Sequence, residues 1–472
     1  MKEQVTDISK VLQDMTEEMR LMRETINQQY AEIVKLNRNI DALNLQIRKK
    51  DKEIEKLLER LSKYENPDKN SNNSSTPPSK ERMEDEIVRR TRTLRKPSGR
   101  KPGGQSGHEG HKLSCSSMPD VVIDDIPGYC TRCGESLADA ERVLDYVTQV
   151  VSIPELKPVI KEIRNYVMVC KNCGERIRTA PRRRSNDVVY DSSVKALVVY
   201  LSVVQFLPYG RIASFLREVF GLTPSEGSLV NWVNEAKRNA QPVIDKIKEY
   251  IMSSAVVGFD ESGLYCNKKL DWAWIAQTVY YTLLFRADGR GSKVLTDKFG
   301  DSLERMTAVT DRHSAYFTLH FLNHQVCLAH LLRELQYLSE LNTGQDWSKK
   351  VTNLFREAIH ERNTNPSNII DRRLDNLLKQ NIDRLGQKFI TFKKGLVKCR
   401  DYIFSFLENP MIPSDNNGSE RGIRKLKIKL KNSCTFRSDF GADAFLELHS
   451  VVETAKKHNK TPYHAIQALF EA

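Results

Sequence analysis

The chain has 472 residues, which is enough for several domains and at least one large buried core. Its formal net charge of +13 at pH 7 is unusual for a metabolic enzyme and indicates a polyanionic partner. It contains no apolar run of about 18 residues and no apolar signal core at its amino terminus, which argues against a membrane or secreted protein. We therefore expect a cytoplasmic protein. Nine cysteines, four of them in two CxxC pairs, fit metal ligation better than disulfides in that compartment.

Residues 1–65 carry a seven-residue repeat of apolar side chains. Its a position is occupied by Val5, Leu12, Met19, Ile26, Ile33, Ile40, Ile47, Ile54 and Leu61. The d position is mostly apolar, and Gln29 and Lys50 interrupt it. This narrow stripe predicts a left-handed coiled coil that forms a parallel homodimer or a higher oligomer. The alternative is a lone amphipathic helix folded onto the rest of the chain, which would show a broader apolar face.

Residues 66–112 contain few side chains that a core could bury. The polar stretch 65–80 predicts a flexible linker. The basic stretch that follows contains Arg89, Arg90, Arg92, Arg95, Lys96, Arg100 and Lys101. We interpret it as an arm lying along a DNA groove, with a solvated run of charges as the alternative.

Two copies of a CxxCG motif lie within residues 113–185. Their four thiols belong to Cys130, Cys133, Cys170 and Cys173. Four thiolates complete a tetrahedral site with no open position, so we predict one structural Zn²⁺. The β-branched stretches 147–153 and 163–169 predict strands, and together these features indicate a zinc ribbon. A redox CxxC is the competing interpretation, and no thioredoxin-like pattern accompanies it. His108 and His111 are interpreted as loop residues.

Residues 186–252 are predicted to be helical. A helix over 211–220, a short turn and a helix over 227–237 resemble a helix-turn-helix whose second helix enters a major groove. The apolar residues within 229–233 fit equally well a helical hairpin packed against a larger domain. Both interpretations stay open at this point.

Strand-like apolar runs begin at residue 255. The run 255–259 ends at Asp260, the runs 272–278 and 280–286 extend it into an antiparallel meander, and a further run, 306–310, ends at Asp311. A last run, 325–329, leads into a helix. Carboxylates that follow neighbouring strands can share a crevice, where they repel one another unless a cation neutralises them. Two metal ions held in this way can promote an in-line phosphoryl displacement.

A third acid, Glu420, is expected early in a helix after the loop Pro413-Ser-Asp415. The basic residues that crowd it are Arg421, Arg424, Lys425, Lys427, Lys429 and Lys431, a set that suits an approaching phosphodiester backbone. Taken singly, each acid is equally well explained as a turn former, a cap or a helix-start charge. Because neighbouring strand residues point to opposite faces, only one of Asp260 and Glu261 should reach the metals, and we choose Asp260.

Taken together, these motifs resemble the transposases of the insertion-sequence-66 family. The resemblance spans residues 1–472 and rests on the zipper, the GGQSGH segment, the paired knuckles, Asp260-Glu261, Asp311 followed by Tyr316, Cys327-Leu-Ala-His330, the segment from Ser414 to Arg421, and the closing Thr454-Ala-Lys and Pro462-Tyr463.

This resemblance implies a ribonuclease-H-like fold whose triad is Asp260, Asp311 and Glu420, holding two Mg²⁺ or Mn²⁺ ions. It implies hydrolysis at the 3′ ends of the element and joining to target DNA without a covalent enzyme intermediate. The implied partners are double-stranded DNA, as element ends and target, and accessory proteins from the same element, in a bacterial-type cytoplasm at the nucleoid. In related recombinases a basic residue seven positions after the glutamate contacts DNA, and Lys427 has that position here.

The expected architecture is multidomain α+β. Its parts are a coiled coil (1–65), a linker and basic arm (66–112), a zinc ribbon (113–185), a helical DNA-binding segment (186–252) and a ribonuclease-H-like α/β catalytic domain (253–339 and 409–472) split by a helical insertion (340–408). One alternative function is a dimeric zinc-containing DNA-binding regulator whose acids are structural. Another is a nuclease that cuts without joining.

Overall fold

The computed structural model describes residues 2–65, 69, 73–74, 107, 114–178, 189–360, 362 and 367–471. The predicted arm, with Arg89, Arg90, Arg92, Arg95, Arg100 and Lys101, lies outside these residues, as do His108 and His111. The helices are α1 (Lys2–Glu65), α2 (Ser192–Val203), α3 (Tyr209–Phe220), α4 (Glu226–Met252), α5 (Lys293–Phe299), α6 (Leu328–Leu341), α7 (Trp347–His360), α8 (Ser367–Lys379), α9 (Gln387–Lys398), α10 (Ser405–Glu408), α11 (Asn417–Ser433), α12 (Asp439–Lys457) and α13 (Pro462–Gln467). The strands are β1 (Val167–Val169), β2 (Arg176–Arg178), β3 (Val256–Cys266), β4 (Lys269–Gln277), β5 (Thr282–Ala287), β6 (Thr307–Thr310) and β7 (Asn323–Val326). Within the described ranges, no helix is both long and apolar enough to cross a membrane.

A mixed sheet of five strands, in the order β5-β4-β3-β6-β7, organises the body of the molecule. β3, β4 and β5 form the predicted antiparallel meander, while β6 pairs with β3 and β7 pairs with β6 in parallel. The prediction that the first strand ends at Asp260 is wrong, because β3 continues to Cys266 in a hairpin with β4. The strand order and the flanking helices are consistent with a ribonuclease-H-like core.

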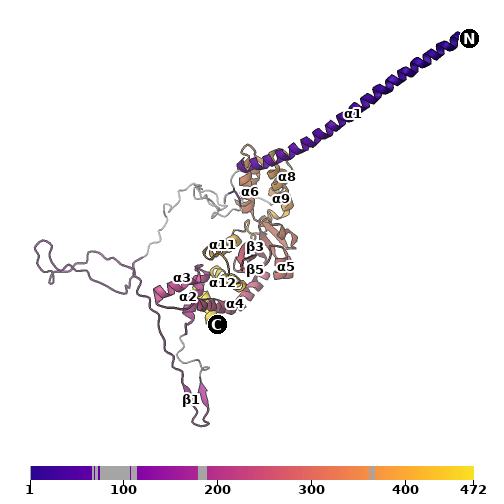
Figure 1. Ribbon diagram of the computed structural model, residues 1–472. Helices are drawn as coiled ribbons and strands as arrows, with labels where there is room; N and C mark the ends of the chain where they lie inside the picture. Colours follow the sequence, from indigo (N-terminus) through magenta and orange to yellow (C-terminus); the bar gives the residue numbers. More distant parts are fainter. Residues whose placement is uncertain are drawn as a thin grey trace.

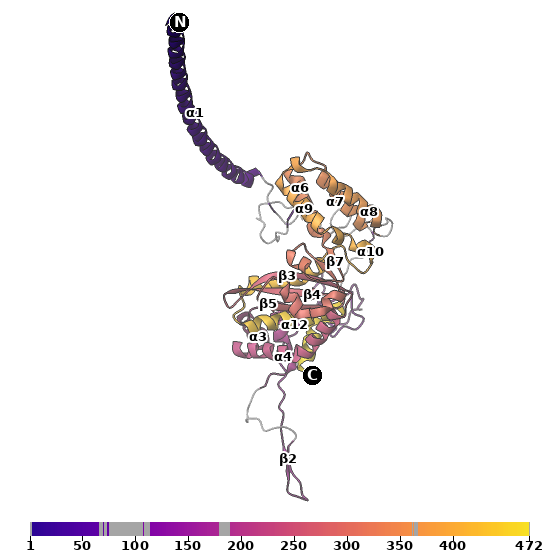
Figure 2. The same cartoon turned by 90° about the vertical axis from the view of Figure 1, so that its right-hand side faces the viewer.

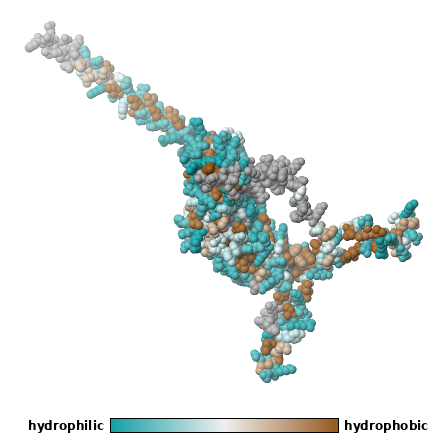
Figure 3. All heavy atoms as spheres, turned by 180° about the vertical axis from the view of Figure 1, so that it is seen from behind, coloured by the Kyte–Doolittle hydropathy of each residue, from teal (hydrophilic) through white to brown (hydrophobic). Residues whose placement is uncertain are grey.

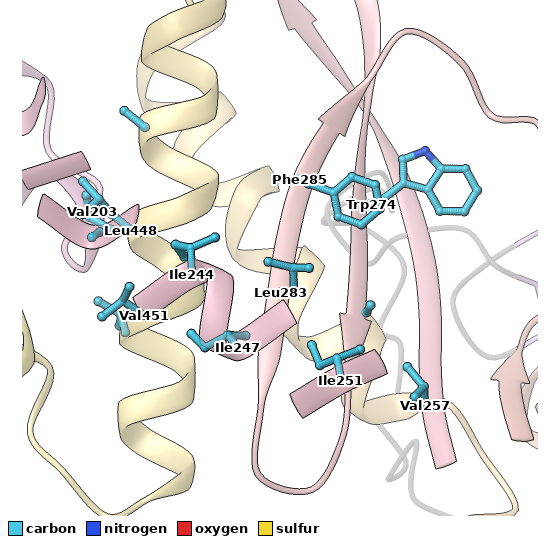
Figure 4. Packing of buried hydrophobic residues seen from close by; sticks show 14 of the residues in the cluster. Val203, Ile244, Ile247, Ile251, Val257, Trp274, Leu283, Phe285, Leu448 and Val451 are labelled. Atoms are coloured by element: carbon cyan, nitrogen blue, oxygen red, sulfur yellow. The ribbon is translucent and has the colours of Figure 1, made fainter. Parts of the chain in front are cut away.

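Helices cover both faces of this sheet. Alternation along β3 turns its odd-numbered residues toward one face and its even-numbered residues toward the other. Figure 4 shows the first face, where α4 and α12 pack on the sheet through Ile244, Ile247, Ile251, Val257, Leu283, Phe285, Leu448 and Val451. On the second face, Ile423 and Leu426 of α11 pack against Leu264 and Ile275.

Helices α6 to α10 form a second unit with a core of its own, beside the end of the sheet that carries β7 (Figure 2). Its fully buried side chains include Leu335, Val351, Phe355, Phe389 and Leu396. Residues 340–408, which were predicted to be helical, form α7 to α10 and two short 3₁₀ turns. The helix α6 enters this unit directly from β7, so the unit starts next to the sheet.

The segment predicted to resemble a helix-turn-helix forms α3 and α4. Ser225 caps α4 by accepting a hydrogen bond from the Ser228 N–H at 3.1 Å. Leu229 and Trp232 are buried against Ile212 and Leu216 of α3. The apolar side of α4 is therefore occupied by packing, as in a helical hairpin, and insertion of α4 into DNA stays a prediction.

Helix α1 is a single helix of 64 residues that extends away from the body (Figure 1). The apolar stripe along it is exposed, with Ile33 at 54% and Ile40 at 53%. After the helix, the Asn73 side chain is buried and its Nδ2 donates to Glu340 Oε2 of α6 at 2.6 Å. The stretch predicted to be a flexible linker thus contains at least one residue that docks on the helical unit.

Candidate active site

Asp260 of β3 and Asp311, the residue directly after β6, follow the paired part of two neighbouring parallel strands. The pairing of β3 with β6 aligns Gly258 with Val309, and continuing that register by two residues places Asp260 opposite Asp311, the residue after β6. Paired positions on parallel strands point to the same face of a sheet, and neighbouring strands are about 4.8 Å apart. The two predicted acids therefore share one edge of one face.

The face that Asp260 occupies distinguishes it from Glu261. Asp260 pairs with Ile275, which lies on the face covered by α11. Glu261 points to the opposite face, where Arg290 Nε donates to its Oε1 at 2.7 Å and the Tyr316 hydroxyl donates to its Oε2. Glu261 is thus neutralised by its own partners, whereas Asp260 faces the helix that carries Glu420.

Glu420 reaches this face because the start of α11 packs tightly on β3. Asn416 Nδ2 donates to the carbonyl of Phe259 at 2.6 Å, directly before Asp260, and Ser419 Oγ donates to Asn416 Oδ1 at 2.6 Å. Any Cβ on Gly258 would lie 2.6 Å from Ser419 Oγ, so only glycine permits this approach. Hydrogen bonds of the polar residues before Glu420 therefore hold the start of α11 against β3.

The acids influence one another electrostatically. Burial raises the pKa of Asp260 well above its usual range, and the charges of Glu261, Asp311 and Glu420 raise it further. Burial and the charge of Glu261 also raise the pKa of Asp311. Carboxylates that oppose each other's ionisation in this way favour a divalent cation between them.

The triad does not converge on a single point. In the described part of the chain, the groups of three metal-type donor atoms within 4.8 Å of one another are Cys327, His330 and Glu420, and Cys266, Asp271 and Asp439. Two metal ions about 3.5–4 Å apart place oxygen ligands on their opposite sides about 8 Å apart, so a two-metal site does not require three acids around one ion. Carboxylate oxygens at one edge of a sheet are the donors that Mg²⁺ and Mn²⁺ prefer. The residues present therefore fit a metal pair.

The basic residues of α11 divide into two groups. Arg421, Arg424 and Lys427 are exposed at helical spacing, as a DNA-facing stripe requires. Lys425 instead pairs with Glu453 at 2.5 Å. Lys429 is buried, and its Nζ lies 3.4 Å from the carbonyl oxygens of residues 202 and 207. The prediction that all the lysines of this helix crowd the phosphate backbone was wrong for these two.

The two CxxCG knuckles have the same backbone geometry. In each, the first cysteine N–H donates to the carbonyl five residues on, and the glycine N–H donates to the first cysteine carbonyl at 2.9 Å. Gly134 and Gly174 have φ values of +77° and +74°, which L side chains rarely adopt. The amide N–H groups three and two residues further along the chain lower the pKa of Cys130 and of Cys170. Each turn thus favours thiolates, although the four sulfur atoms of the two knuckles do not form one of the donor groups within 4.8 Å.

The strands predicted around the knuckles are present only in part. β1 and β2 form an antiparallel hairpin that carries Cys170 and Cys173. Residues 147–153 form no strand, and Val150 and Ile153 there are 85% and 84% exposed. In the described residues no strand pairs with this stretch, and its β-branched side chains are exposed. A complete zinc ribbon is therefore still a prediction.

Two residues beside Glu420 were not assigned a role from the sequence. His330 Nε2 lies 3.6 Å from Glu420 Oε1, and burial lowers the pKa of His330 to about 4. Arg333 Nη2 lies 3.4 Å from the same oxygen. The Cys327-Leu-Ala-His330 motif marked this helix in the sequence, but no local signal connected it to an acid 90 residues away.

Comparison with known proteins decides the family. A family model described as transposase IS66 family matches residues 187–444, more than half of the chain and all three predicted acids. This chain belongs to the IS66 transposase family. Its IS66 domain is of the DDE type, a polynucleotidyl transferase, and DDE transposases use divalent metal ions. A second model, for a family of unknown function (DUF6444), matches residues 17–114 of this IS66 protein. The chain is also similar to the uncharacterized protein y4jD of Sinorhizobium fredii, with 23% identity over 401 residues, covering 75% of this chain and 76% of that protein.

Proposed function

We propose that this IS66 family protein binds the ends of its own insertion sequence and catalyses strand cleavage and strand transfer with Asp260, Asp311 and Glu420 as metal ligands. The proposal is carried by the nearness of Asp311 and Glu420 to Asp260, whose pKa is raised by burial first and then by the charges of Glu261, Asp311 and Glu420. Buried carboxylates that oppose one another's ionisation cost stability, so their presence favours a function that requires them.

The three acids would hold the divalent ions through their carboxylate oxygens. The charges of Asp311 and Glu420 both act on Asp260, so a cation held by these residues would relieve their mutual repulsion. Bound divalent ions activate the attacking oxygen and stabilise the leaving oxygen of a phosphoryl transfer. On the opposite face of the sheet, hydrogen bonds from Tyr316 and Arg290 hold the Glu261 carboxylate. These contacts fix the position of β3 next to Asp260.

The other parts of the chain supply binding and assembly in this proposal. The exposed arginines and lysine of α11, Arg421, Arg424 and Lys427, contact phosphates together with the arm that contains Arg89, Arg90, Arg92, Arg95, Arg100 and Lys101. Cys130, Cys133, Cys170 and Cys173 hold one structural Zn²⁺. The exposed seam of α1 pairs in parallel with a second copy of the chain.

The test is cleavage of DNA that carries the inverted repeats flanking the gene, with Mg²⁺ and purified protein. The isosteric variants D260N, D311N and E420Q should each lower cleavage about a thousandfold or more while leaving binding to the same DNA nearly unchanged. D288N is the matched control, because the Asp288 side chain is 82% exposed and lies outside the cluster. Undiminished cleavage by the three variants would refute the assignment. Tight, specific DNA binding without any cleavage by the natural chain would indicate the regulator instead, and cut but never joined products would indicate the nuclease.

A further inference from the structure

The carboxylate of Glu420 lies between two guanidinium groups. Arg424 of the same helix donates to Glu420 Oε2 at 2.6 Å, and Arg333 of α6 donates to Oε1 at 3.4 Å. Both oxygens that a metal ion would use are therefore directed at cations of the protein itself. These arginines neutralise the third acid as long as no divalent ion does.

Arg333 uses little of its hydrogen-bonding capacity. Its side chain is 16% exposed, its Nε is buried without a hydrogen-bond partner among the described residues, and the 3.4 Å contact is long for a charged pair. A buried guanidinium normally satisfies most of its five N–H groups, because leaving them unpaired costs free energy. The nearby Arg312 also has one buried nitrogen, Nη1, without a hydrogen-bond partner among the described residues, but it has a closer acceptor, since it donates to Glu334 at 2.6 Å, and it lies over the Phe392 ring at 5.2 Å. Arg333 thus has free donors at a position where a further acceptor would stabilise it.

The helix that carries Arg333 is fixed to the acid-bearing edge of the sheet. The N–H of Leu328, the first residue of α6, donates to the Ser414 carbonyl at 3.0 Å. The N–H of Asn416 donates to Cys327 Sγ at 3.2 Å. The start of α6 and the loop before Glu420 therefore form one rigid corner, which gives Arg333 a defined distance from the acids.

We propose that Arg333 is a phosphate-binding catalytic residue, which Glu420 holds in the metal-free protein and which contacts a nonbridging oxygen of the scissile phosphodiester once that carboxylate is engaged by a divalent ion. The proposal rests on the assignment of the three acids as metal ligands. A forked guanidinium matches two phosphate oxygens better than a lysine does.

Charge balance favours this role. Three carboxylates and two divalent ions leave one positive charge, which matches the single negative charge of a phosphodiester. The transition state carries one further negative charge, and Arg333 supplies the cation that balances it. In the hydrolytic step a bond forms between water oxygen and phosphorus, the bond from phosphorus to the 3′ oxygen breaks, that oxygen gains a proton, and the water proton goes to solvent. Arg333 exchanges no proton in this step.

The experiment combines substitution of Arg333 with removal of the charge of one phosphate and compares the effects of the two changes made singly and together. The full-length natural chain and the R333A, R333Q and R333K variants are tested on end DNA with an ordinary phosphate or an uncharged methylphosphonate at the cleavage position. Binding is measured by fluorescence anisotropy in Ca²⁺, and cleavage is measured in Mg²⁺. R333A and R333Q should weaken binding of ordinary DNA about tenfold and slow its cleavage about a hundredfold or more. They should leave binding of methylphosphonate DNA unchanged, and R333K should fall between them and the natural chain. R356A, at an exposed arginine of α7, should affect both DNAs equally little.

Two results would overturn the role of Arg333. If the variants weaken binding of both DNAs equally, the guanidinium does not contact this phosphate. If excess Mn²⁺ restores full cleavage to R333A, the arginine acts only through Glu420 and the metal. Thermal melting of R333K and R333Q identifies loss of fold. Failure of the natural chain to cleave ordinary DNA would count against the proposed transposition chemistry, while the binding cycle in Ca²⁺ would still measure the contact between arginine and phosphate.

Discussion

The two parts of the chain differ in the burial of their apolar side chains. In the later part, residues 189–471, these side chains form buried clusters, whereas the described residues of the earlier part, 2–178, expose most of them. All four buried apolar clusters of the described residues lie in the later part. In the earlier part the apolar side chains face solvent, with Ile33 54% exposed, Ile123 84% and Ile160 92%. Figure 3 shows the same contrast, with brown apolar spheres along the protruding segments and a mainly teal surface on the body.

This contrast indicates where each part obtains its stability. Burial of apolar surface is the main favourable contribution to folding, so the later part can be stable by itself. The earlier part has the sequence patterns of ordered structure, and none of the four buried clusters found among the described residues lies in it, so we expect its stability to depend on partners. For α1 the expected partner is a second α1, and for the two knuckles it is a cation. The separate family matches, 187–444 and 17–114, follow a similar division.

Zinc removal should give the largest effect, and only in the earlier part. The natural chain should bind one Zn²⁺, and C130S or C170S should bind none, because a structural site needs all four thiolates. Chelation should expose residues 114–178 to proteolysis and leave the melting of residues 189–471 unchanged. Zinc content by mass spectrometry and limited proteolysis measure both. C115S is the matched control, since Cys115 is an exposed thiol outside the knuckles. Zinc retained by both knuckle variants would contradict the four-cysteine site.

Charged residues in the seam of α1 should disrupt assembly without affecting the catalytic fold. The double variant I33D/I40D should raise the dimer dissociation constant a hundredfold or more, because each buried isoleucine contributes about 1.5–3 kcal/mol. Sedimentation equilibrium measures this change. R38D is the control, because position 38 lies on the outer side of the predicted coiled coil. A natural chain that stays monomeric at high concentration would favour the lone helix.

Enlarging Gly258 tests the later part, where stability and catalysis are coupled. A Cβ at Gly258 would lie 2.6 Å from Ser419 Oγ and 2.8 Å from Asn416 Oδ1, and both groups are held by hydrogen bonds. G258A should therefore displace the start of α11, destabilise the fold by about 1–3 kcal/mol and slow cleavage about a hundredfold, since a shift of about 1 Å can cost that much. Cleavage rates and thermal melting report the two effects.

The control for Gly258 is Gly263, in the same strand. A Cβ there would lie 3.2 Å from Leu270 Cδ1, the end of a half-exposed and flexible side chain. G263A should therefore have little effect on either measurement. Equal losses in the two variants would mean that the close contact of α11 with β3 does not position Glu420.

Local sequence patterns predicted the elements of the sheet and the positions of its acids. Short apolar runs mark β4, β5 and β6, and a carboxylate after β6 is visible without any knowledge of tertiary structure. The predicted run 325–329 was placed too late, because β7 is Asn323–Val326 and α6 already begins at Leu328. The continuation of β3 beyond Asp260 was missed because Glu261, Ser262 and Gly263 interrupt the apolar alternation. Their burial depends on β4 and on Tyr316, which a local pattern cannot reveal.

Contacts between distant residues explain the remaining failures. Lys425 and Lys429 have the same local sequence context as the exposed Lys427. However, Lys425 pairs with Glu453 of α12, and the Lys429 Nζ lies against the carbonyl oxygens of residues 202 and 207. Arg333 gave no signal for the same reason, since its link to Glu420 exists only when α6 and α11 pack together. The three acids can be predicted from the order of motifs along the sequence. The basic side chains that neutralise them can be identified only from the packing of the helices.

The smallest expected effect is a pH dependence that belongs to the later part alone. His449 of α12 is buried, stacked on Phe445 at 5.4 Å between ring centres, and burial lowers its pKa to about 4. The charged groups facing it are Glu453, Lys425 and Lys456. Between its unfolded pKa of about 6.5 and its folded pKa of about 4, the unfolded chain binds a proton that the folded chain does not, so stability falls as the pH falls through this window.

Replacing His449 by phenylalanine keeps the ring stacking and removes this proton. The variant should lose less stability than the natural chain between pH 7 and pH 4, by at most about 3 kcal/mol at 1.36 kcal/mol per pKa unit. Urea unfolding followed across this pH range measures the difference. H464F is the control for replacing a histidine by phenylalanine elsewhere in the later part, because the His464 side chain is exposed. If H449F kept the natural slope, acid destabilisation of the later part would have to come from other groups, such as His324 and His330, whose pKa values burial also lowers to about 4.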